Sequence, residues 1–277
     1  MLILDFFSYN GEPIINFRLK YLYDYVDKFI IVESIYTYSG IKKDDYYYNK
    51  NRDLFKEFEE KIIFIPLDHY LPKGEDYMKI VNIINYVRYI DLKDAWIAEI
   101  YLRDFIQKKL KEIFNGPYII FVCDIDEIPK KSLYSYVKND YDKLHNGIHI
   151  EMIHLLYGFN WKKKNNWFHQ FVTTDKGVNN NSLSLMRLTN HHTYYRNAGW
   201  HISHFLSIKD LIRKIESFAH TELNLDKYKQ IEHLKNCIEK GINIFDNNDL
   251  LIKTNDDELP ENYKEIDEEI RKTFLIN

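Results

Sequence analysis

The chain of 277 residues lacks the features that mark secreted and membrane-spanning proteins. It has only two cysteines, Cys123 and Cys237, too few for a disulfide framework and compatible with a reducing compartment. No apolar run approaches the ~20 residues that span a bilayer. The N-terminal segment Met1-Leu2-Ile3-Leu4-Asp5 has neither the basic region nor the long apolar core of a signal peptide. We therefore expect a protein without a membrane segment that works in the cytoplasm.

The chain also lacks an excess of one charge sign and lacks internal repeats. Its 38 basic and 42 acidic residues give a net charge of −4, which offers no general argument for nucleic acid as a partner. No repeat with a period of about 20 to 50 residues is present. The hydrophobic fraction of 45% is ordinary for a globular protein, and the length allows one substantial core. We expect one main domain over residues 1–245 and a helical tail over residues 246–277.

The N-terminal residues have the pattern of a strand, a helix and a second strand. Residues 2–7 are apolar and predict a strand, and Pro13 suits the first turn of a helix. Apolar residues then recur at helical spacing, which predicts an amphipathic helix over residues 13–27. Residues 29–32 predict the second strand. Two strands joined by a helix in this way pair in parallel, with a right-handed crossover.

The rest of the chain continues the same alternation as far as its patterns can be followed. Residues 35–50 predict a loop over the carboxyl edge of the sheet, where functional loops gather. Residues 158–198 have little periodicity and predict no definite element. The other predicted elements are a helix over 52–61, a strand over 62–65, a helix over 94–114, a strand over 118–122, an extended segment over 148–156, and helices opening near 207, 226 and 260. The predicted fold class is α/β, a Rossmann-type sheet flanked by helices with a C-terminal helical extension.

The most informative segment follows the predicted strand over residues 118–122. It reads Cys123-Asp124-Ile125-Asp126-Glu127-Ile128, so its carboxylates lie where open α/β sheets place their ligands. In an extended segment residues i and i+2 point the same way, so Asp124 and Asp126 would face one spot while Glu127 turns elsewhere. Two hard oxygen donors suit a Mg²⁺ or Mn²⁺ ion that also holds substrate phosphates.

Other interpretations of this acidic segment stay open. Acidic residues at strand ends also serve as helix caps or as solvated turn residues. Phosphatases of the haloacid-dehalogenase type also carry D-x-D after a strand, but they usually continue with Thr or Val near the first strand of the domain. Here Glu127-Ile128-Pro129 follows, more than 120 residues into the chain. This position disfavours the phosphatase.

Several further segments, taken in order along residues 2 to 245, match one enzyme family. They are Asn10 with Arg18-Leu19, residues 23–34, Thr37 to Gly40, Glu99 with Arg103, Asp124 to Pro129, Gly199-Trp200-His201 with Ser203, and residues 215–222. In these segments the chain resembles the family 17 glycosyltransferases, whose animal members add a bisecting N-acetylglucosamine to N-glycans. Departures at Gly11-Glu12, Lys43-Asp44 and Ile202 concern the acceptor and the fine donor contacts more than the reaction class.

The resemblance implies a GT-A type fold and a specific kind of reaction. The expected donor is a UDP-sugar, in particular UDP-N-acetylglucosamine, and the expected acceptor is a glycan that is linked with inversion at the anomeric carbon. Mn²⁺ or Mg²⁺ is the expected cofactor, because a divalent cation stabilises the negative charge on the departing diphosphate. Two alternatives remain: a non-catalytic protein that binds carbohydrate or nucleotide, and a nucleotide-sugar hydrolase that uses water as acceptor.

The expected metal ligands come from the acidic segment and from two histidines. Asp126 is the first choice as a direct ligand, whereas Asp124 contacts either the ribose or the metal through water. Glu127 either orients these groups or is a structural turn carboxylate. His201 and His220 are the candidates for a further ligand, with His201 first because it belongs to the more general family motif.

Four residues are expected on the donor side of the site. Asn10 is one of them, from the resemblance alone. Glu33 ends the second strand and contacts either the uridine or ribose of the donor, or a helix end or basic partner. Arg103 binds diphosphate in a bidentate fork or pairs with Glu99 one turn away. Trp200, like Trp161 and Trp167, stacks on a sugar ring or belongs to the core.

Inversion also requires a general base that takes the proton of the acceptor hydroxyl. Glu216 and Glu222 are the candidates for this role. His191-His192 and His204 are weaker candidates for the metal, with surface or core positions expected instead.

Overall fold

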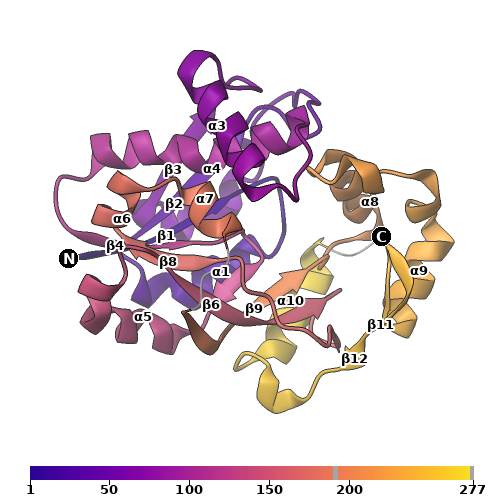
Figure 1. The fold of residues 1–277 in the computed structure, drawn as a ribbon. Coiled ribbons are helices and arrows are strands. Elements are labelled where there is room, and N and C mark those ends of the chain that lie inside the picture. The colour runs from indigo at the N-terminus through magenta and orange to yellow at the C-terminus, as the bar shows by residue number, and fades with distance from the viewer. Residues whose placement is uncertain (190–192, 275–277) are drawn as a thin grey trace.

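The structure is a computed structural model that describes residues 1–189 and 193–274, and it is built around a mixed β-sheet (Figure 1). Its strands are β1 Leu2–Ser8, β2 Lys28–Ser34, β3 Ile62–Leu67, β4 Tyr118–Val122, β5 Glu127–Pro129, β6 Ile148–Leu156, β7 Trp161–Lys162, β8 Phe171–Thr174, β9 Tyr194–Ser203, β10 Ile242–Asn243, β11 Asp246–Leu250 and β12 Ile252–Lys253. Its α-helices are α1 Ile15–Leu22, α2 Tyr47–Lys50, α3 Gly74–Val87, α4 Asp94–Ile113, α5 Lys131–Val137, α6 Asp175–Asn180, α7 Leu183–Leu188, α8 Ile208–Ser217, α9 Ile231–Lys240 and α10 Tyr263–Phe274. The 3₁₀ helices are η1 Tyr23–Tyr25, η2 Arg52–Lys61, η3 Lys138–Lys143, η4 Thr221–Leu223, η5 Asp226–Tyr228 and η6 Asp256–Glu258.

The sheet order places the carboxyl ends of its parallel strands at one edge. The large sheet runs β12-β7-β6-β8-β4-β1-β2-β3, and β3, β2, β1 and β4 are parallel to one another. Strand β8 is antiparallel to β4, and β9 pairs with β6 on one side and β5 on the other. The carboxyl ends of β1, β2 and β4 therefore meet at one edge, next to β5 and β9. The α/β fold class predicted from the sequence is confirmed.

Helices cover both faces of the parallel strands, so these strands are apolar on both sides. Figure 1 shows α3, α4, α6 and α7 on one face and α1, α5 and α10 on the other. Alternate residues of β1 serve the two layers, since Leu4 and Phe6 pack with α3 and α4 while Ile3 and Phe7 pack with α1. A third, smaller apolar cluster joins α8 and α9 to the end of β6 (Figure 1).

Most of the elements predicted from apolar periodicity are present. The strands over 2–7, 29–32, 62–65, 118–122 and 148–156 and the helix over 94–114 are confirmed, with ends that differ by up to about two residues. The helix predicted over 13–27 is shorter and ends in η1, and the helix predicted over 52–61 is present with those bounds as a 3₁₀ helix. The helix that opens at Ser207 ends at Ser217, one residue before Phe218.

Helices and strands lie within residues 158–198, whose sequence predicts no definite element, and the sequence patterns do not predict α3. The structure has β7, β8, α6, α7 and the start of β9 in that stretch, all too short to show a period. Two of these helices begin at side-chain caps: Thr174 accepts from the amide of Gly177, and Ser182 accepts from the amide of Leu185. Short capped helices of this kind need tertiary packing to form.

The segment over residues 246–277, predicted as a helical tail, contains strands as well as a helix. Strand β12 pairs with β7 of the large sheet, and Ile270 of α10 belongs to the core beneath α1. In the described part of the chain, no helix combines the length and apolar character needed to cross a membrane. Cys123 and Cys237 are both buried free thiols.

A buried ion pair connects β1 and α1 to the acidic segment after β4. Arg18 and Asp5 are both 0% exposed, and the guanidinium donates to both carboxylate oxygens of Asp5 at 2.7 and 2.8 Å. The remaining nitrogen, Nη1, donates to the backbone carbonyls of Asp124, Ile125 and Glu127 at 3.0, 3.1 and 2.7 Å. One side chain thus holds the whole acidic turn against the first strand.

We expect Arg18→Met to destabilise the fold strongly, because it leaves the Asp5 carboxylate buried without its partner. Removing one member of a buried pair typically costs ~3–5 kcal/mol. The free energy of unfolding in urea measures this loss. Lys20→Met on the same helix is the matched control, since Lys20 pairs with Glu269 at the surface and should contribute ~1 kcal/mol or less. Equal losses of unfolding free energy in the two variants would contradict the stabilising role assigned to the buried pair of Arg18 and Asp5.

Candidate functional site

The candidate site is a cleft at the edge where β1, β2 and β4 end. One hollow is lined by polar residues of several segments, among them Ser8, Asn10, Glu12, Ser34, Lys43 and Lys214. A second hollow is lined by Glu99, Arg103, Cys123 and Asp124. The two share Ser8, Tyr38 and Leu102, so they form one continuous region. Ligands of open α/β sheets bind at such an edge.

The acidic segment crosses this edge as a turn and not as the extended segment predicted from the sequence. The amide of Glu127 donates to the carbonyl of Asp124 at 3.0 Å, which closes the turn. The expectation that Asp124 and Asp126 face one spot through the i and i+2 rule is therefore wrong in its premise. The two carboxylates have different partners, because the three carbonyls held by Arg18 impose the turn.

Asp126 lies between a histidine and a lysine. Its Oδ1 is 3.4 Å from His201 Nε2, and its Oδ2 is 3.3 Å from Lys214 Nζ. The residue is 7% exposed, and its carbonyl accepts from the amide of Ile202 at 2.7 Å, which aligns β5 with β9. Burial raises the pKa of the Asp126 carboxyl, but Lys214 and His201 together outweigh it and hold the pKa well below its usual range.

Asp124 and Glu127 share one buried arginine, Arg187, and Asp124 also contacts a second, Arg103. Arg187 Nη2 is 2.6 Å from Asp124 and 2.7 Å from Glu127, and its Nη1 donates to Glu127 at 2.9 Å. Arg103 approaches the other oxygen of Asp124 at 3.2 Å and is 3.5 Å from Glu99. Glu127 also accepts from the indole of Trp167 and, at 2.6 Å, from the amide of Asp124. Burial raises the pKa of Glu127, but its partners, Arg187 foremost, bring it down to about 2.

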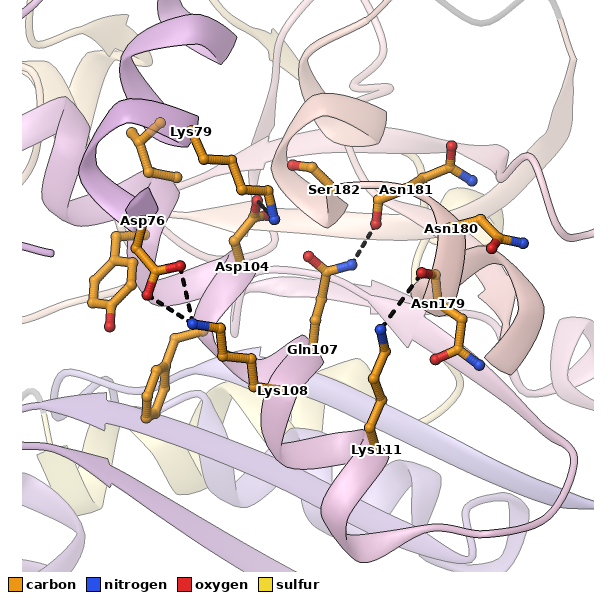
Figure 2. A pocket seen from close by; sticks show the side chains of 13 residues that line it. Asp76, Lys79, Asp104, Gln107, Lys108, Lys111, Asn179, Asn180, Asn181 and Ser182 are labelled. Atoms are coloured by element: carbon orange, nitrogen blue, oxygen red, sulfur yellow. Dashed lines mark hydrogen bonds and ion pairs between the residues drawn. The ribbon is translucent and has the colours of Figure 1, made fainter. Parts of the chain in front are cut away.

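The helices that carry these arginines are locked together behind the site (Figure 2). Gln107 of α4 donates through its side-chain amide to the carbonyls of Val178, at 2.7 Å, and Asn181. Asp104 accepts from the amide of Ser184 in α7 at 2.8 Å, and Lys108 pairs with Asp76 of α3. Figure 2 shows Gln107 directed to Asn181 and Lys108 directed to Asp76 in the pocket between α3, α4 and the α6–α7 segment. The network fixes the spacing at which Arg103 and Arg187 approach Asp124.

Glu33 and Asn10, both predicted to bind the sugar donor, contact the same lysine, Lys43. Glu33 is fully buried, forms an ion pair with Lys43, and accepts from the amides of Tyr47 and Tyr48 at 2.6 and 2.9 Å. Its carboxylate therefore caps the first turn of α2. Lys43 Nζ also lies 3.5 Å from the side-chain oxygen of Asn10, which lines the cleft. Glu33 thus positions Lys43 and the loop over residues 35–50.

The two consecutive residues Trp200 and His201 lie on opposite faces of β9. Trp200 is 3% exposed, donates to the carbonyl of Glu258 at 2.7 Å, and contacts the ring of Tyr21 edge-on. His201 faces Asp126, with the rings of Trp167 and His154 at centroid distances of 4.5 and 4.6 Å. The structure therefore has Trp200 in the core and Trp167 beside the predicted metal ligands.

His220 and Glu222 are paired with each other. His220 Nδ1 is 2.8 Å from Glu222, and its ring packs edge-on against Trp96 at the start of α4. Glu216 pairs with Lys229 at 3.3 Å, and its carbonyl accepts from the hydroxyl of Ser39.

The predicted site residues therefore fall into groups. Asp124, Asp126, Glu127, Arg103 and His201 come together at the carboxyl end of β4. Glu33 and Trp200 are turned to α2 and to the core, and His220, Glu222 and Glu216 have partners of their own. His204 is half-buried, and the loss of solvent around its ring lowers its pKa well below the usual value. His191 and His192 lie outside the described residues.

Three basic residues of the site, Lys43, Arg187 and Lys214, were not predicted from the sequence. Arg187 lies in the stretch that predicted no definite element, where Ser182 followed by apolar Leu183 is the only sign of a helix start. Lys214 lies three residues after buried Leu211 and next to buried Ile215, so its place on the inner side of α8 could have been read from the helical spacing.

The donor set around Asp126 fits a divalent cation that is held mainly by its substrate. Within residues 1–189 and 193–274, no three His, Cys, Asp or Glu side chains gather as a metal site. Asp126 and His201 nevertheless present an oxygen and a nitrogen 3.4 Å apart, and His201 Nδ1 is buried without a hydrogen-bond partner. Mg²⁺ in phosphate-transfer sites commonly takes one or two protein ligands, and phosphates and waters supply the others. Both oxygens of Asp124 face buried arginines at 3.2 and 2.6 Å, whereas Asp126 faces a histidine and a more exposed lysine at 3.4 and 3.3 Å, which makes Asp126 and His201 the better-fitting pair.

We expect Arg187→Met to destabilise the fold in a pH-dependent way. The pKa of Glu127 in the folded protein, about 2, lies below its ordinary value of 4.5, so the ionised form stabilises the fold above pH 4.5 and loses that effect as pH falls towards 2. Without Arg187, burial would instead raise this pKa. The variant should lose ~3–5 kcal/mol at pH 7, and the loss should shrink towards pH 5 as Glu127 takes up a proton.

Urea unfolding of the wild type and the variant between pH 5 and 7 measures this effect. Arg196→Met is the control, because Arg196 is exposed and lies over the ring of Tyr194. A loss in Arg187→Met that is the same at both ends of the pH range would contradict the assigned Glu127 contact.

Comparison with known proteins was made for the whole chain. A protein-family model, glycosyltransferase family 17, matches residues 4–255 of the 277 residues. A search of curated proteins finds no match. The matched region includes every element that contributes to the cleft, and it confirms the resemblance noted in the sequence segments. The chain therefore belongs to glycosyltransferase family 17 and is a glycosyltransferase.

Proposed function

We propose that this enzyme transfers N-acetylglucosamine or a related sugar from a UDP donor to a glycan, with inversion and with the help of Mn²⁺ or Mg²⁺. The observation that carries the proposal is the position of Asp126. Its carboxylate is almost fully buried at the carboxyl edge of β1 and β4, with His201 at one oxygen and Lys214 at the other. A carboxylate, an imidazole and an ammonium that lie together, with the ammonium lining the cleft, suit the binding of a cation together with a diphosphate.

The cleft offers the donor polar and cationic groups. Nucleotides bind in open α/β sheets at the carboxyl ends of the strands, here lined by Ser8, Asn10 and Tyr38. Lys43 and Lys214 supply positive charge for the phosphates. The preference for uridine and for N-acetylglucosamine, like the GT-A type of the fold, rests on the resemblance to the animal members described above.

Asp126 and His201 would hold the divalent cation, which would supply charge stabilisation to the diphosphate as it leaves the sugar. The side chains of the protein neutralise the acidic turn and fix its shape. Arg103 and Arg187 neutralise Asp124 and Glu127, so these two acids do not repel the incoming phosphates. Glu127 keeps the turn closed through the amide of Asp124, and Trp167 packs on His201. The site is therefore organised before the donor arrives.

Inversion needs a base on the acceptor side, and Glu222 and Glu216 remain its candidates. Both side chains are about half-exposed, as a group that meets an incoming acceptor must be. Burial raises the pKa of Glu222, but its hydrogen bond with His220 outweighs this and lowers the pKa below the ordinary value. Glu222 is therefore ionised near neutral pH and able to accept the hydroxyl proton.

Turnover assays with and without acceptor separate this proposal from its alternatives. A transferase releases UDP from UDP-N-acetylglucosamine in step with glycan product, which mass spectrometry detects as a mass increase of one sugar. A hydrolase releases the same UDP without an acceptor. A protein that only binds carbohydrate or nucleotide releases none. A screen of donors and glycan acceptors by mass spectrometry then identifies the linkage.

We expect Asp126→Ala to lower Mn²⁺-dependent turnover by ~10²-fold or more, because the carboxylate that holds the cation is lost. The rate of UDP release at saturating donor and Mn²⁺ measures this effect, with circular dichroism as a check that the variant is folded. Asp142→Ala is the control, since Asp142 is exposed and its ion pair with Lys176 is long, at 3.8 Å. Wild-type activity in a folded Asp126→Ala protein would exclude the proposed site.

We expect the two histidines to differ in their effect on metal use. His201→Ala should raise the Mn²⁺ concentration needed for half-maximal activity by a large factor, because His201 faces Asp126 at 3.4 Å. His220→Ala should change stability or acceptor use, because His220 is bound to Glu222 and Trp96. Mn²⁺ titrations of activity and thermal melts of both variants separate the two effects. A structure with UDP and Mn²⁺ that has His220 as a metal ligand would reverse the assignment.

A further inference from the structure

We infer that Lys214 is a displaceable cation that holds Asp126 while the cleft is without nucleotide and moves to the diphosphate when the donor arrives. Lys214 would thereby make the binding of the divalent cation dependent on the binding of the nucleotide. This inference rests on the proposed function, since it assumes a diphosphate donor and a cation at Asp126.

One carboxylate, that of Asp126, serves two cationic sites. Asp126 Oδ2 is 3.3 Å from Lys214 Nζ, while Oδ1 faces His201, the other proposed ligand. The Lys214 side chain is 26% exposed and lines the cleft, so a ligand can reach its ammonium group. Buried Leu211 and Ile215 fix α8 beneath it, so the side chain can move while the helix stays in place.

The balance of charge around Asp126 also favours the displacement of Lys214. A divalent cation at Asp126 and His201 would lie close to the Lys214 ammonium, and like charges repel strongly where water is largely excluded. The single negative charge of Asp126 cannot neutralise both. Glu12 lines the same cleft and accepts from the amide of Asn10 at 2.7 Å, but even with its charge counted, two carboxylates face the three positive charges of the ion and the lysine. A nucleoside diphosphate brings the missing negative charge, and its phosphate oxygens are acceptors to which Lys214 can turn.

Lys214 differs from the other cations of the cleft in the partner that it contacts. Arg103 and Arg187 are buried and contact carboxylates of the turn and of α4, and Lys43 is paired with buried Glu33. Among the basic residues described at the cleft, Lys214 is the one whose partner is also the proposed metal ligand. A lysine has a flexible stem and three donors, so it can exchange a carboxylate for a phosphate without rearranging the backbone.

The test is to measure binding of Mn²⁺ and UDP to the whole chain with Lys214→Met, which keeps the length of the side chain and removes its charge. Isothermal titration of Mn²⁺ without nucleotide should give a dissociation constant ~10-fold lower than in the wild type, because Asp126 is no longer occupied. Titration of UDP at saturating Mn²⁺ should give a dissociation constant ~10-fold higher, because the phosphates lose a donor. Neither readout depends on turnover.

Lys209→Met is the matched control, because Lys209 is an exposed lysine of the same helix. It should bind Mn²⁺ and UDP as the wild type does, and melting curves verify that both variants are folded.

If Lys214→Met binds Mn²⁺ no more tightly than the wild type, the inference is overturned even where UDP binding is weakened. If the wild type binds neither Mn²⁺ nor UDP with Mn²⁺, the cation-dependent donor site fails as well. A wild type that binds both and a variant identical to it would overturn the inference alone.

Discussion

The guanidinium of Arg18 is the interaction on which the candidate site depends. It uses one edge for the Asp5 carboxylate of β1 and a third nitrogen for three carbonyls of the acidic turn, all without exposure to solvent. Because those carbonyls converge on one donor, the chain turns sharply after β4. That turn sends Asp124 towards α4 and α7 and Asp126 towards β9 and α8. A buried charge pair is costly to build, and here its extra hydrogen bonds supply the compensation that such pairs need.

The turn divides the charges of the site into a fixed part and an adaptable part. On one side, Asp124 and Glu127 are matched by arginines, whose planar forks suit carboxylates and whose helices are locked by Gln107 and Asp104. On the other side, Asp126 meets an imidazole and an ammonium at distances above 3 Å, on groups that line or border the cleft. A ligand with phosphates can therefore compete for the second set of contacts without disturbing the first.

The sequence predicted the parts of this arrangement that depend on local patterns. The strands over 2–7, 29–32 and 118–122 and the position of the acidic segment at a strand end follow from apolar runs and are present. The directions of the side chains do not follow from such runs. The turn at Ile125 depends on Arg18, more than 100 positions earlier in the chain, and Arg187 comes from a six-residue helix that only tertiary contacts stabilise. The Rossmann-like sheet was thus predictable, while the basic partners of the acids were not.

The segment Gly199-Trp200-His201 illustrates why a motif does not by itself assign roles. A side chain at Gly199 would place its Cβ 2.7 Å from the carbonyl of Ile128 and from Met152, so β5 can approach β9 only because this residue is glycine. Strand alternation then sends Trp200 into the core, where it binds the carbonyl of Glu258, and sends His201 to Asp126. One residue permits the close pairing, one attaches the C-terminal segment, and one faces the site. These three roles fall to consecutive residues because β9 has the core on one face and the site on the other.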